Sequence, residues 1–228
     1  RDFREERNLL KQQVEPQINK FARNRMVRAT VIDLRWGITD EQSSKGMTLP
    51  LCLQQVEHCR PFFVGLLGQR YGWVPAADAF PGELMQRIPW LQKHVGGSSM
   101  TELEIRHGTL EAVIAKDDAY FYFRDAAYAA GKGPDFETTS PEEITKLESL
   151  KQAIRERGFR LREGYQDPRA FAKSVTDDLW AKIDALYPAD LLGDAALEDW
   201  TAHHSYATQL IRSYQSDDTE LQSVRACI

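Results

Sequence analysis

The sequence SSMTELEIRHG, residues 98–108, predicts a helix that begins directly after a loop and carries carboxylates close to its start. Two apolar runs precede it, VIDLRWG at residues 31–37 and FFVGLLGQRYGW at residues 62–73. Each predicts a strand that leads into a loop with Gly and aromatic residues. This order is typical of an open α/β sheet, in which ligands bind beyond the carboxyl ends of the strands.

Strands and helices alternate along the rest of the chain. The patterns predict strands at residues 27–34, 62–67, 119–123 and 159–163, and helices at residues 2–24, 49–58, 99–114, 141–157, 168–186 and 197–214. Asp2 is expected to cap the first helix, and Pro16 to kink or split it. We therefore expect a flavodoxin-like α/β fold, with a mainly parallel sheet and helices on both faces, at residues 1–188. Residues 189–228 are expected to form a helical extension and linker.

The composition is that of an ordinary globular protein. Of 228 residues, 29 are basic and 34 acidic, and the interspersed signs disfavour a nucleic-acid partner. No apolar run approaches the roughly 20 residues that span a bilayer, so we expect no membrane partner and a cytoplasmic location. Cys52 and Cys59 are seven residues apart on a predicted helix, which favours buried reduced thiols over a disulfide or a metal site.

The two glutamates of the opening stretch have different predicted roles. Ser99 and Glu102 have the S-x-x-E spacing of a capping box, which makes Glu102 structural. Glu104 lies outside that box, with Gly108 one turn further on, where a missing side chain would leave an uncovered groove. Its carboxylate could therefore face the ligand edge; the alternative is a solvated glutamate near the positive end of the helix.

Arginine and tryptophan recur in the two loops that follow the first strands. Arg35 with Trp36, and Arg70 with Trp73, could bind phosphate through the guanidinium and stack a planar base on the indole. The alternative is that Asp33 pairs with a local arginine and that both tryptophans wedge the loops against the core. The sequence has no GxxxxGK[ST], no GxSxG and no GxGxxG after a strand, so P-loop, serine hydrolase and dinucleotide fingerprints are missing.

Four motifs occur in a specific order, at residues 33–39, 52–59, 61–72 and 101–104. Together they resemble the TIR-like domain of unknown function that precedes a NACHT/STAND NTPase in telomerase-associated vault proteins, nephrocystin-3 and bacterial relatives. The resemblance covers about residues 1–123 closely. It implies a TIR-like fold, a NACHT/STAND NTPase in cis, a homo-oligomer formed through the rest of the chain, and signalling in innate immunity or antiviral defence. That family opens with a further strand, so we expect this chain to be a piece of a longer protein.

A more distant resemblance concerns the chemistry. The pattern Thr101-x-x-Glu104-Ile105-x-x-Gly108 is similar to the helix start of TIR NAD hydrolases and of nucleoside deoxyribosyltransferases, although TIR enzymes often have Cys or Ser where Thr101 stands. It implies that Glu104 is catalytic, that NAD⁺ is a substrate with no bound cofactor or metal, and that a neighbouring protomer completes the site. Arg35 and Arg70 would then lie near the phosphates, and Trp36 or Trp73 against a base.

Two other functions remain open. One is a non-enzymatic domain that self-associates or binds a partner through its loops and through the Pro- and Gly-rich insertion at residues 75–97. The weaker one is a nucleoside-processing enzyme of the deoxyribosyltransferase type that uses the same glutamate.

Overall fold

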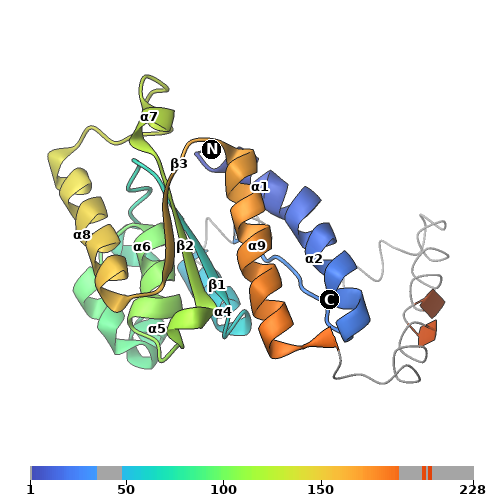
Figure 1. Cartoon of the computed structure of the whole chain (residues 1–228). Coiled ribbons are helices and arrows are strands. Elements are labelled where there is room, and N and C mark those ends of the chain that lie inside the picture. Colours follow the sequence, from blue (N-terminus) through green and yellow to red (C-terminus); the bar gives the residue numbers. More distant parts are fainter. Residues whose placement is uncertain (1, 35–47, 190–201, 204, 207–228) are drawn as a thin grey trace, which may run out of the picture. The chain divides into compact units, whose positions relative to one another are not determined.

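The computed structural model describes residues 2–34, 48–189, 202–203 and 205–206 (Figure 1). The chain divides into two compact units, the first made of residues 1–12 and 31–173 and the second of residues 13–30 and 174–228. The first unit carries the β-sheet and the candidate site.

Three parallel strands form the sheet, in the order β1 (Phe63–Leu67), β2 (Ala119–Arg124) and β3 (Arg160–Tyr165). Phe123 is aligned with Leu67 on one side and with Glu163 on the other, so the carboxyl ends of the strands meet at one edge. Every residue of β2 is buried, as expected for an apolar strand in the middle of a parallel sheet. The predicted α/β class with a parallel sheet is confirmed.

Helices α4 (Thr48–His58), α6 (Met100–Ile105) and α8 (Pro141–Arg157) flank the sheet (Figure 1). Apolar side chains of the strands pack against α8 in one buried cluster, which includes Leu67, Phe121, Phe123, Leu147, Leu150 and Ile154. The limits of α8 are those the sequence predicts. The Ser140 hydroxyl accepts a hydrogen bond from the Glu143 N–H, and Gly158 follows the helix with a φ of 69°.

A π-helical turn at Arg106–Leu110 continues α6 and lies against β1. A Cβ atom on Gly108 would lie 2.6 Å from Cδ2 of Phe63 and 3.1 Å from Cγ1 of Val56. Gly108 therefore allows helix and strand to approach closely. The predicted open groove beside Gly108 is wrong, because the ring of Phe63 fills the space.

The insertion at residues 75–97 contains α5 (Gly82–Arg87) and a 3₁₀ helix, Pro89–His94. Its apolar side chains pack onto α4 and α6 in a second buried cluster, which includes Leu49, Leu53, Phe80, Leu84, Ile88, Leu91 and Leu103. The apolar side chains of the insertion are thus buried within the first unit, where they cover one side of α4 and α6.

The N-terminal helix is divided into α1 (Arg4–Leu9), a π-helical turn at Leu10–Val14, and α2 (Glu15–Ala22). Pro16 lacks the N–H that would continue the regular ladder, which accounts for the widened turn before it. The predicted cap is wrong: Phe3 occupies the N-cap position without a side-chain hydrogen bond, and the carboxylate of Asp2 pairs with Arg124 instead.

The predicted strand at residues 27–34 is also wrong, since residues 27–33 have no strand structure. The side chain of Asn19 binds both backbone polar groups of Ala29, donating to its carbonyl and accepting from its N–H at 2.8 Å each. These groups are satisfied without a neighbouring strand. The β-branched residues of this segment favour a strand, but the local hydrogen bonds to Asn19 override that preference.

The second unit contains α2 and the part of α9 (Pro168–Leu186) that begins at Ser174. Phe21 stacks on Trp180, while Arg25 lies 3.9 Å above the Phe21 ring and pairs with Asp184. The limits predicted for the helix at residues 168–186 are confirmed. Most of the helix predicted at residues 197–214 lies outside the described residues.

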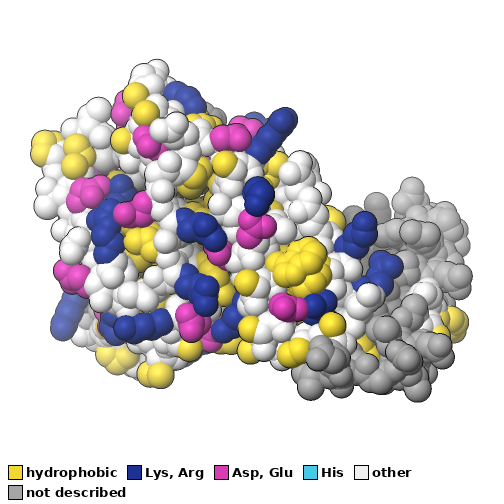
Figure 2. Space-filling model, viewed as in Figure 1, with side chains coloured by type: hydrophobic (Ala, Val, Ile, Leu, Met, Phe, Trp, Pro, Cys, Tyr) yellow, Lys and Arg dark blue, Asp and Glu magenta, His cyan; other side chains and the backbone are white. Residues whose placement is uncertain are grey.

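Acidic and basic side chains are mixed on the described surface that Figure 2 presents, with no large region of one sign. Among the helices that the structure describes, none combines the length and apolar character that crossing a bilayer requires.

Candidate functional site

Helix α6 starts beside the loop that follows β1. The N–H of Met100 donates to the carbonyl of Trp73 at 2.9 Å. Gly72, with a φ of 99°, turns the chain between the end of β1 and Trp73. The start of α6, with Glu102 in its first turn and Glu104 two residues further on, therefore lies at the carboxyl edge of the sheet. This edge is where parallel sheets place their ligands.

Glu104 is half-buried and has neighbours from three other segments. Cys52, in α4, acts on its carboxyl group and lowers its pKa, while the thiol itself donates to the carbonyl oxygen of Leu34 at 4.0 Å. Arg7 of α1 and Asp33 both exert an electrostatic effect on Glu104, and they form an ion pair with each other, with Nη1 and Oδ1 2.7 Å apart. Four segments far apart in sequence thus meet around one carboxyl group.

This environment changes the acidity of Glu104. Burial raises the pKa of its carboxyl group from 4.5 to about 7, against the opposing effects of Arg7 and of Cys52; the negative charge of Asp33 raises it further. Burial, followed by the nearby Glu104 carboxylate, raises the pKa of Cys52 to about 12. Near neutral pH the site therefore holds a neutral thiol beside a carboxyl group that readily exchanges its proton, which suits a general acid or base.

Glu102 has a different set of contacts. Its backbone N–H donates to the Ser99 hydroxyl at 3.2 Å, which confirms Ser99 as the N-cap. Its carboxylate does not return to the Ser99 N–H, as a full capping box requires, but accepts hydrogen bonds from Tyr71 and from Nε of Arg106. Glu102 is therefore structural, as predicted. Its carboxylate, however, binds Tyr71 and Arg106 instead of the Ser99 N–H.

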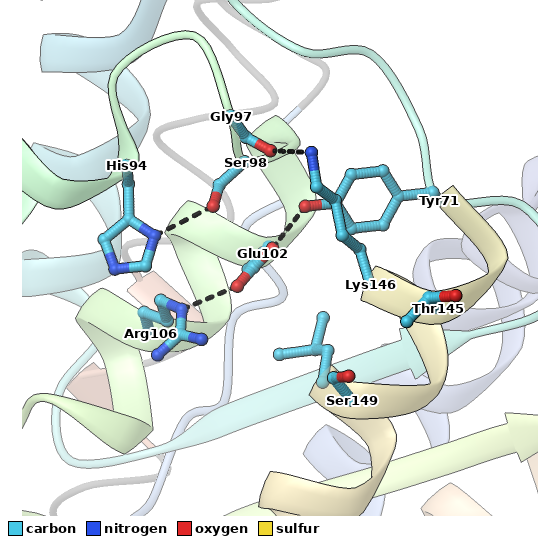
Figure 3. Close-up of a pocket in the computed structure, with 10 residues that line it drawn as sticks. Tyr71, His94, Gly97, Ser98, Glu102, Arg106, Thr145, Lys146 and Ser149 are labelled. Carbon is cyan, nitrogen blue, oxygen red and sulfur yellow. Dashed lines mark hydrogen bonds and ion pairs between the residues drawn. The ribbon is translucent and has the colours of Figure 1, made fainter. Parts of the chain in front are cut away.

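A pocket of about 170 Å³ opens beside Glu102, between α6 and α8 (Figure 3). Across it, Nζ of Lys146 donates to the Gly97 carbonyl at 2.8 Å, and Nδ1 of His94 lies 2.8 Å from the Ser98 hydroxyl. Burial and the charge of Arg106 lower the pKa of His94, which keeps this imidazole neutral at pH 7. The polar groups of this pocket largely bind one another, and Glu104 is not among the residues that line it.

A buried arginine ends the central strand. Arg124 is fully buried and pairs with Asp2 and Glu6, both close to the start of the chain. The Tyr165 hydroxyl also lies 3.1 Å from Glu6, and the ring of Phe3 lies against the guanidinium. Glu6 Oε2 and Arg124 Nε are buried without a hydrogen-bond partner. These contacts fix α1 on the sheet.

The predicted ligand residues have different outcomes. Arg35 and Trp36 lie outside the described residues. Arg70 is half-buried, and its charge acts on Asp2. The Trp73 side chain is 57% exposed, so the alternative in which it wedges the loop against the core is wrong for this residue. The structure therefore leaves Trp73 accessible beside the start of α6, while its contact with a base stays a prediction.

Sequence reasoning missed three members of the Glu104 environment. Arg7 gave no signal, because nothing in the helical pattern of α1 relates it to residue 33 or 104. The alternative to ligand contact had Asp33 pairing with a nearby arginine, but its described ion pair is with the distant Arg7. Both thiols are reduced, as predicted, but only Cys52 is buried; the prediction that Cys59 is buried is wrong, because this side chain is half-exposed. Within the described part of the chain, no group of three or more His, Cys, Asp and Glu side chains could hold a metal ion.

The family model "Domain of unknown function (DUF4062)" matches residues 1–180. The chain belongs to this family. The DUF4062 chain is 31% identical over 203 residues to a TPR repeat-containing protein of Dictyostelium discoideum, covering 83% of the chain and 12% of that protein. It is 33% identical over 162 residues to telomerase protein component 1 of Rattus norvegicus, covering 68% of the chain and 6% of that protein.

A shorter match links the DUF4062 chain to NACHT domain- and WD repeat-containing protein 1 of Mus musculus, at 37% identity over 75 residues, 31% of the chain and 5% of that protein. The chain thus spans only a small part of each of these relatives. No solved structure matches it. The predicted relation to telomerase-associated and NACHT proteins is confirmed at the level of the family.

Proposed function

We propose that this DUF4062 chain is a TIR-like effector or signalling domain of a NACHT/STAND protein, and that it hydrolyses NAD⁺ at the bond between nicotinamide and ribose. The observation that carries the proposal is the position of Glu104 at the start of the helix beside the loop after β1. There it is partly shielded from water and near its protonation midpoint at neutral pH.

The chemistry suits a single carboxylate. The C1′–N bond of NAD⁺ breaks, its electron pair leaves with neutral nicotinamide, and water then adds to C1′ with loss of a proton. The ribosyl group passes through a cationic state that an ionised carboxylate can stabilise or trap. Glu104 would supply this charge in its ionised form and accept the proton of the attacking water. Arg70 and Trp73 would bind the phosphates and a base, together with Arg35 and Trp36.

The relatives support the context of this activity. One of them is named for a NACHT domain, so we place such an NTPase in cis, after residues 189–228, and assign to it the assembly of a homo-oligomer. In this view residues 1–188 are the effector domain. Assembly would bring a second copy against the site, and NAD⁺ hydrolysis would begin only in the assembled, cytoplasmic protein.

A specific observation favours a second candidate, a non-enzymatic interaction domain. The described pocket at α6 lies beside Glu102 rather than Glu104, and its polar groups bind one another. The exposed indole of Trp73, at the same edge, would then contact a protein partner.

The test is nicotinamide release by the full-length, oligomerised protein and by its Glu104→Gln and Glu102→Gln variants. Glu104→Gln preserves size and removes the charge, and we expect at least a ~100-fold loss of rate. Glu102→Gln should retain activity in proportion to the folded fraction, measured by circular dichroism. Turnover that is absent from every assembled form would reject the enzyme and favour the interaction domain.

A further inference from the structure

The pocket between α6 and α8 lies on the side of α6 that faces away from Glu104. Glu102 and Arg106, which line it, are four residues apart and therefore share one side of the helix. Glu104 follows Glu102 by two residues, about 200° around a helix with ~3.6 residues per turn, and does not line the pocket. A molecule bound there would contact the helix that carries Glu104 without touching its carboxyl group.

Positive charge outweighs negative charge in the lining of this pocket. Arg106 reaches it from the end of α6, and Lys146 and Ser149 reach it from α8 (Figure 3). Among the described residues that line the pocket, Glu102 carries the single carboxylate. His94 adds no charge at pH 7, because burial lowers the pKa of its imidazole. Two cations and one carboxylate leave a net positive charge.

Two further carboxylates pair with the cations from outside the lining. Glu111 lies 3.4 Å from Nη1 of Arg106, and Glu142 lies 2.7 Å from Nζ of Lys146. Their side chains are 36% and 76% exposed, so water and salt screen their charge from the interior of the pocket. The pocket therefore keeps its attraction for an anion.

The hydrogen-bonding groups of the pocket have more donors than acceptors. The Gly97 carbonyl and both oxygens of Glu102 already accept hydrogen bonds. Lys146 has three N–H groups, of which Gly97 and Glu142 take two. Arg106 has five, and its described contacts use Nε and Nη1, which leaves both hydrogens of Nη2. These remaining donors match a ligand with several negatively charged oxygens.

The size of the pocket narrows the choice of ligand. Its volume of about 170 Å³ is that of roughly five or six water molecules at ~30 Å³ each. A phosphate group fits this space, alone or with a short organic chain that leaves through the mouth of the pocket. A guanidinium binds phosphate through parallel N–H···O bonds, and an ammonium binds it as a point charge. Arg106 and Lys146 supply one of each.

We propose that the pocket between α6 and α8 binds a phosphate group between Arg106 and Lys146, with the exposed Ser149 at its mouth. The ligand is a small phosphomonoester or free phosphate. This site goes beyond the proposed hydrolysis of NAD⁺, because its occupancy needs no turnover and uses none of the residues assigned to that reaction.

The first experiment titrates the full-length protein with inorganic phosphate and with glycerol phosphate, a short phosphomonoester, in a calorimeter. Ser149→Asp places a carboxylate at the mouth of the pocket, so it should weaken binding at least ~tenfold. Ser149→Asn, of similar size and neutral, should bind within about twofold of wild type. Tighter binding of glycerol phosphate assigns the site to an ester, and equal affinity assigns it to free phosphate. Equal affinity of Ser149→Asp and wild type for both probes would overturn the proposal.

The second experiment reads the pocket directly in the wild-type protein, so it depends neither on the folding of a variant nor on anion sites elsewhere. Lysines are acetylated with and without each probe, and the rates are measured by mass spectrometry. Bound phosphate should slow the acetylation of Lys146 at least ~threefold. Lys132 is the matched control, because it is exposed above the ring of Tyr128, and its rate should not change. The same rate at Lys146 with and without both probes would refute a phosphate site here.

Discussion

Tyr71 donates its phenolic hydrogen to the carboxylate of Glu102, and its oxygen accepts a hydrogen bond from the N–H of Ser99 at 3.2 Å. The same Glu102 carboxylate accepts from Nε of Arg106 at 2.7 Å. Tyr71 thus takes the place of the glutamate in satisfying the first N–H of the helix cap. The loop after β1 and the start of α6 are joined through this one hydroxyl group.

Tyr71→Phe should therefore destabilise the protein by about 1–3 kcal/mol, because it leaves the buried Ser99 N–H without its acceptor and removes a donor from Glu102. Urea unfolding followed by circular dichroism measures the change. Glu142→Gln, in an exposed ion pair with Lys146, is the control and should cause no measurable loss. Equal stability of Tyr71→Phe and wild type would show that water replaces the hydroxyl.

Glu104→Gln should have the opposite effect on stability. Because burial raises the pKa of Glu104 from 4.5 to about 7, the contribution of its carboxyl group is fully present below pH 4.5 and is lost as the pH rises through 7. The variant has no charge to bury. Its free energy of unfolding should exceed that of wild type by about 2–3 kcal/mol at pH 8.

At pH 4.5 the carboxyl group of Glu104 is mostly neutral in the folded protein. Wild type and Glu104→Gln should therefore have similar free energies of unfolding at this pH. Urea unfolding at both pH values gives the comparison. A constant difference between wild type and Glu104→Gln at pH 4.5 and pH 8 would contradict the raised pKa of Glu104.

Arg124→Met should cost about 3–5 kcal/mol, because it leaves the carboxylates of Asp2 and Glu6 buried without their cation. Adding Glu6→Gln to this variant should recover part of the loss, since one uncompensated charge is removed. A double-mutant cycle in urea measures the coupling between positions 6 and 124. Additive effects of the two changes would show that water already screens the pair.

Gly108→Ala should destabilise the protein by about 1–3 kcal/mol, since its new methyl group would overlap the Phe63 ring. Gly82 is the matched control, because it begins a helix and a Cβ atom added there would have no heavy atom within 4 Å. Gly82→Ala should leave the melting temperature equal or slightly higher. Similar losses at both positions would point to backbone effects rather than to packing.

Elements with local signals were predictable from the sequence. Ser140 and Gly158 mark the ends of α8 by cap chemistry, and the aromatic run of β2 indicates a buried strand. The segment at residues 27–34 shows the limit of such signals. Its β-branched residues predict a strand, but the hydrogen bonds of Asn19 to Ala29 decide its backbone.

The candidate site was predictable only in part, for a similar reason. Glu104 could be singled out because the spacing to Ser99 assigns Glu102 to the helix cap. Its relation to Cys52 and Arg7 depends on how α4 and α1 pack beside α6, and no spacing in the sequence records that packing. The acidity of a buried group is a property of such distant neighbours.

Charged side chains of α1, with Asp2 just before it, connect the end of β2 to the surroundings of Glu104. Asp2 and Glu6 hold the end of β2 through Arg124, while Arg7, the residue after Glu6, holds Asp33 beside Glu104. A helix this short is stiff, so α1 cannot leave Arg124 without withdrawing Arg7 as well. Because the charge of Arg7 lowers the pKa of Glu104, that withdrawal would shift the carboxyl group towards its neutral form. A displacement of helix α1 from the sheet would therefore change the protonation state of Glu104.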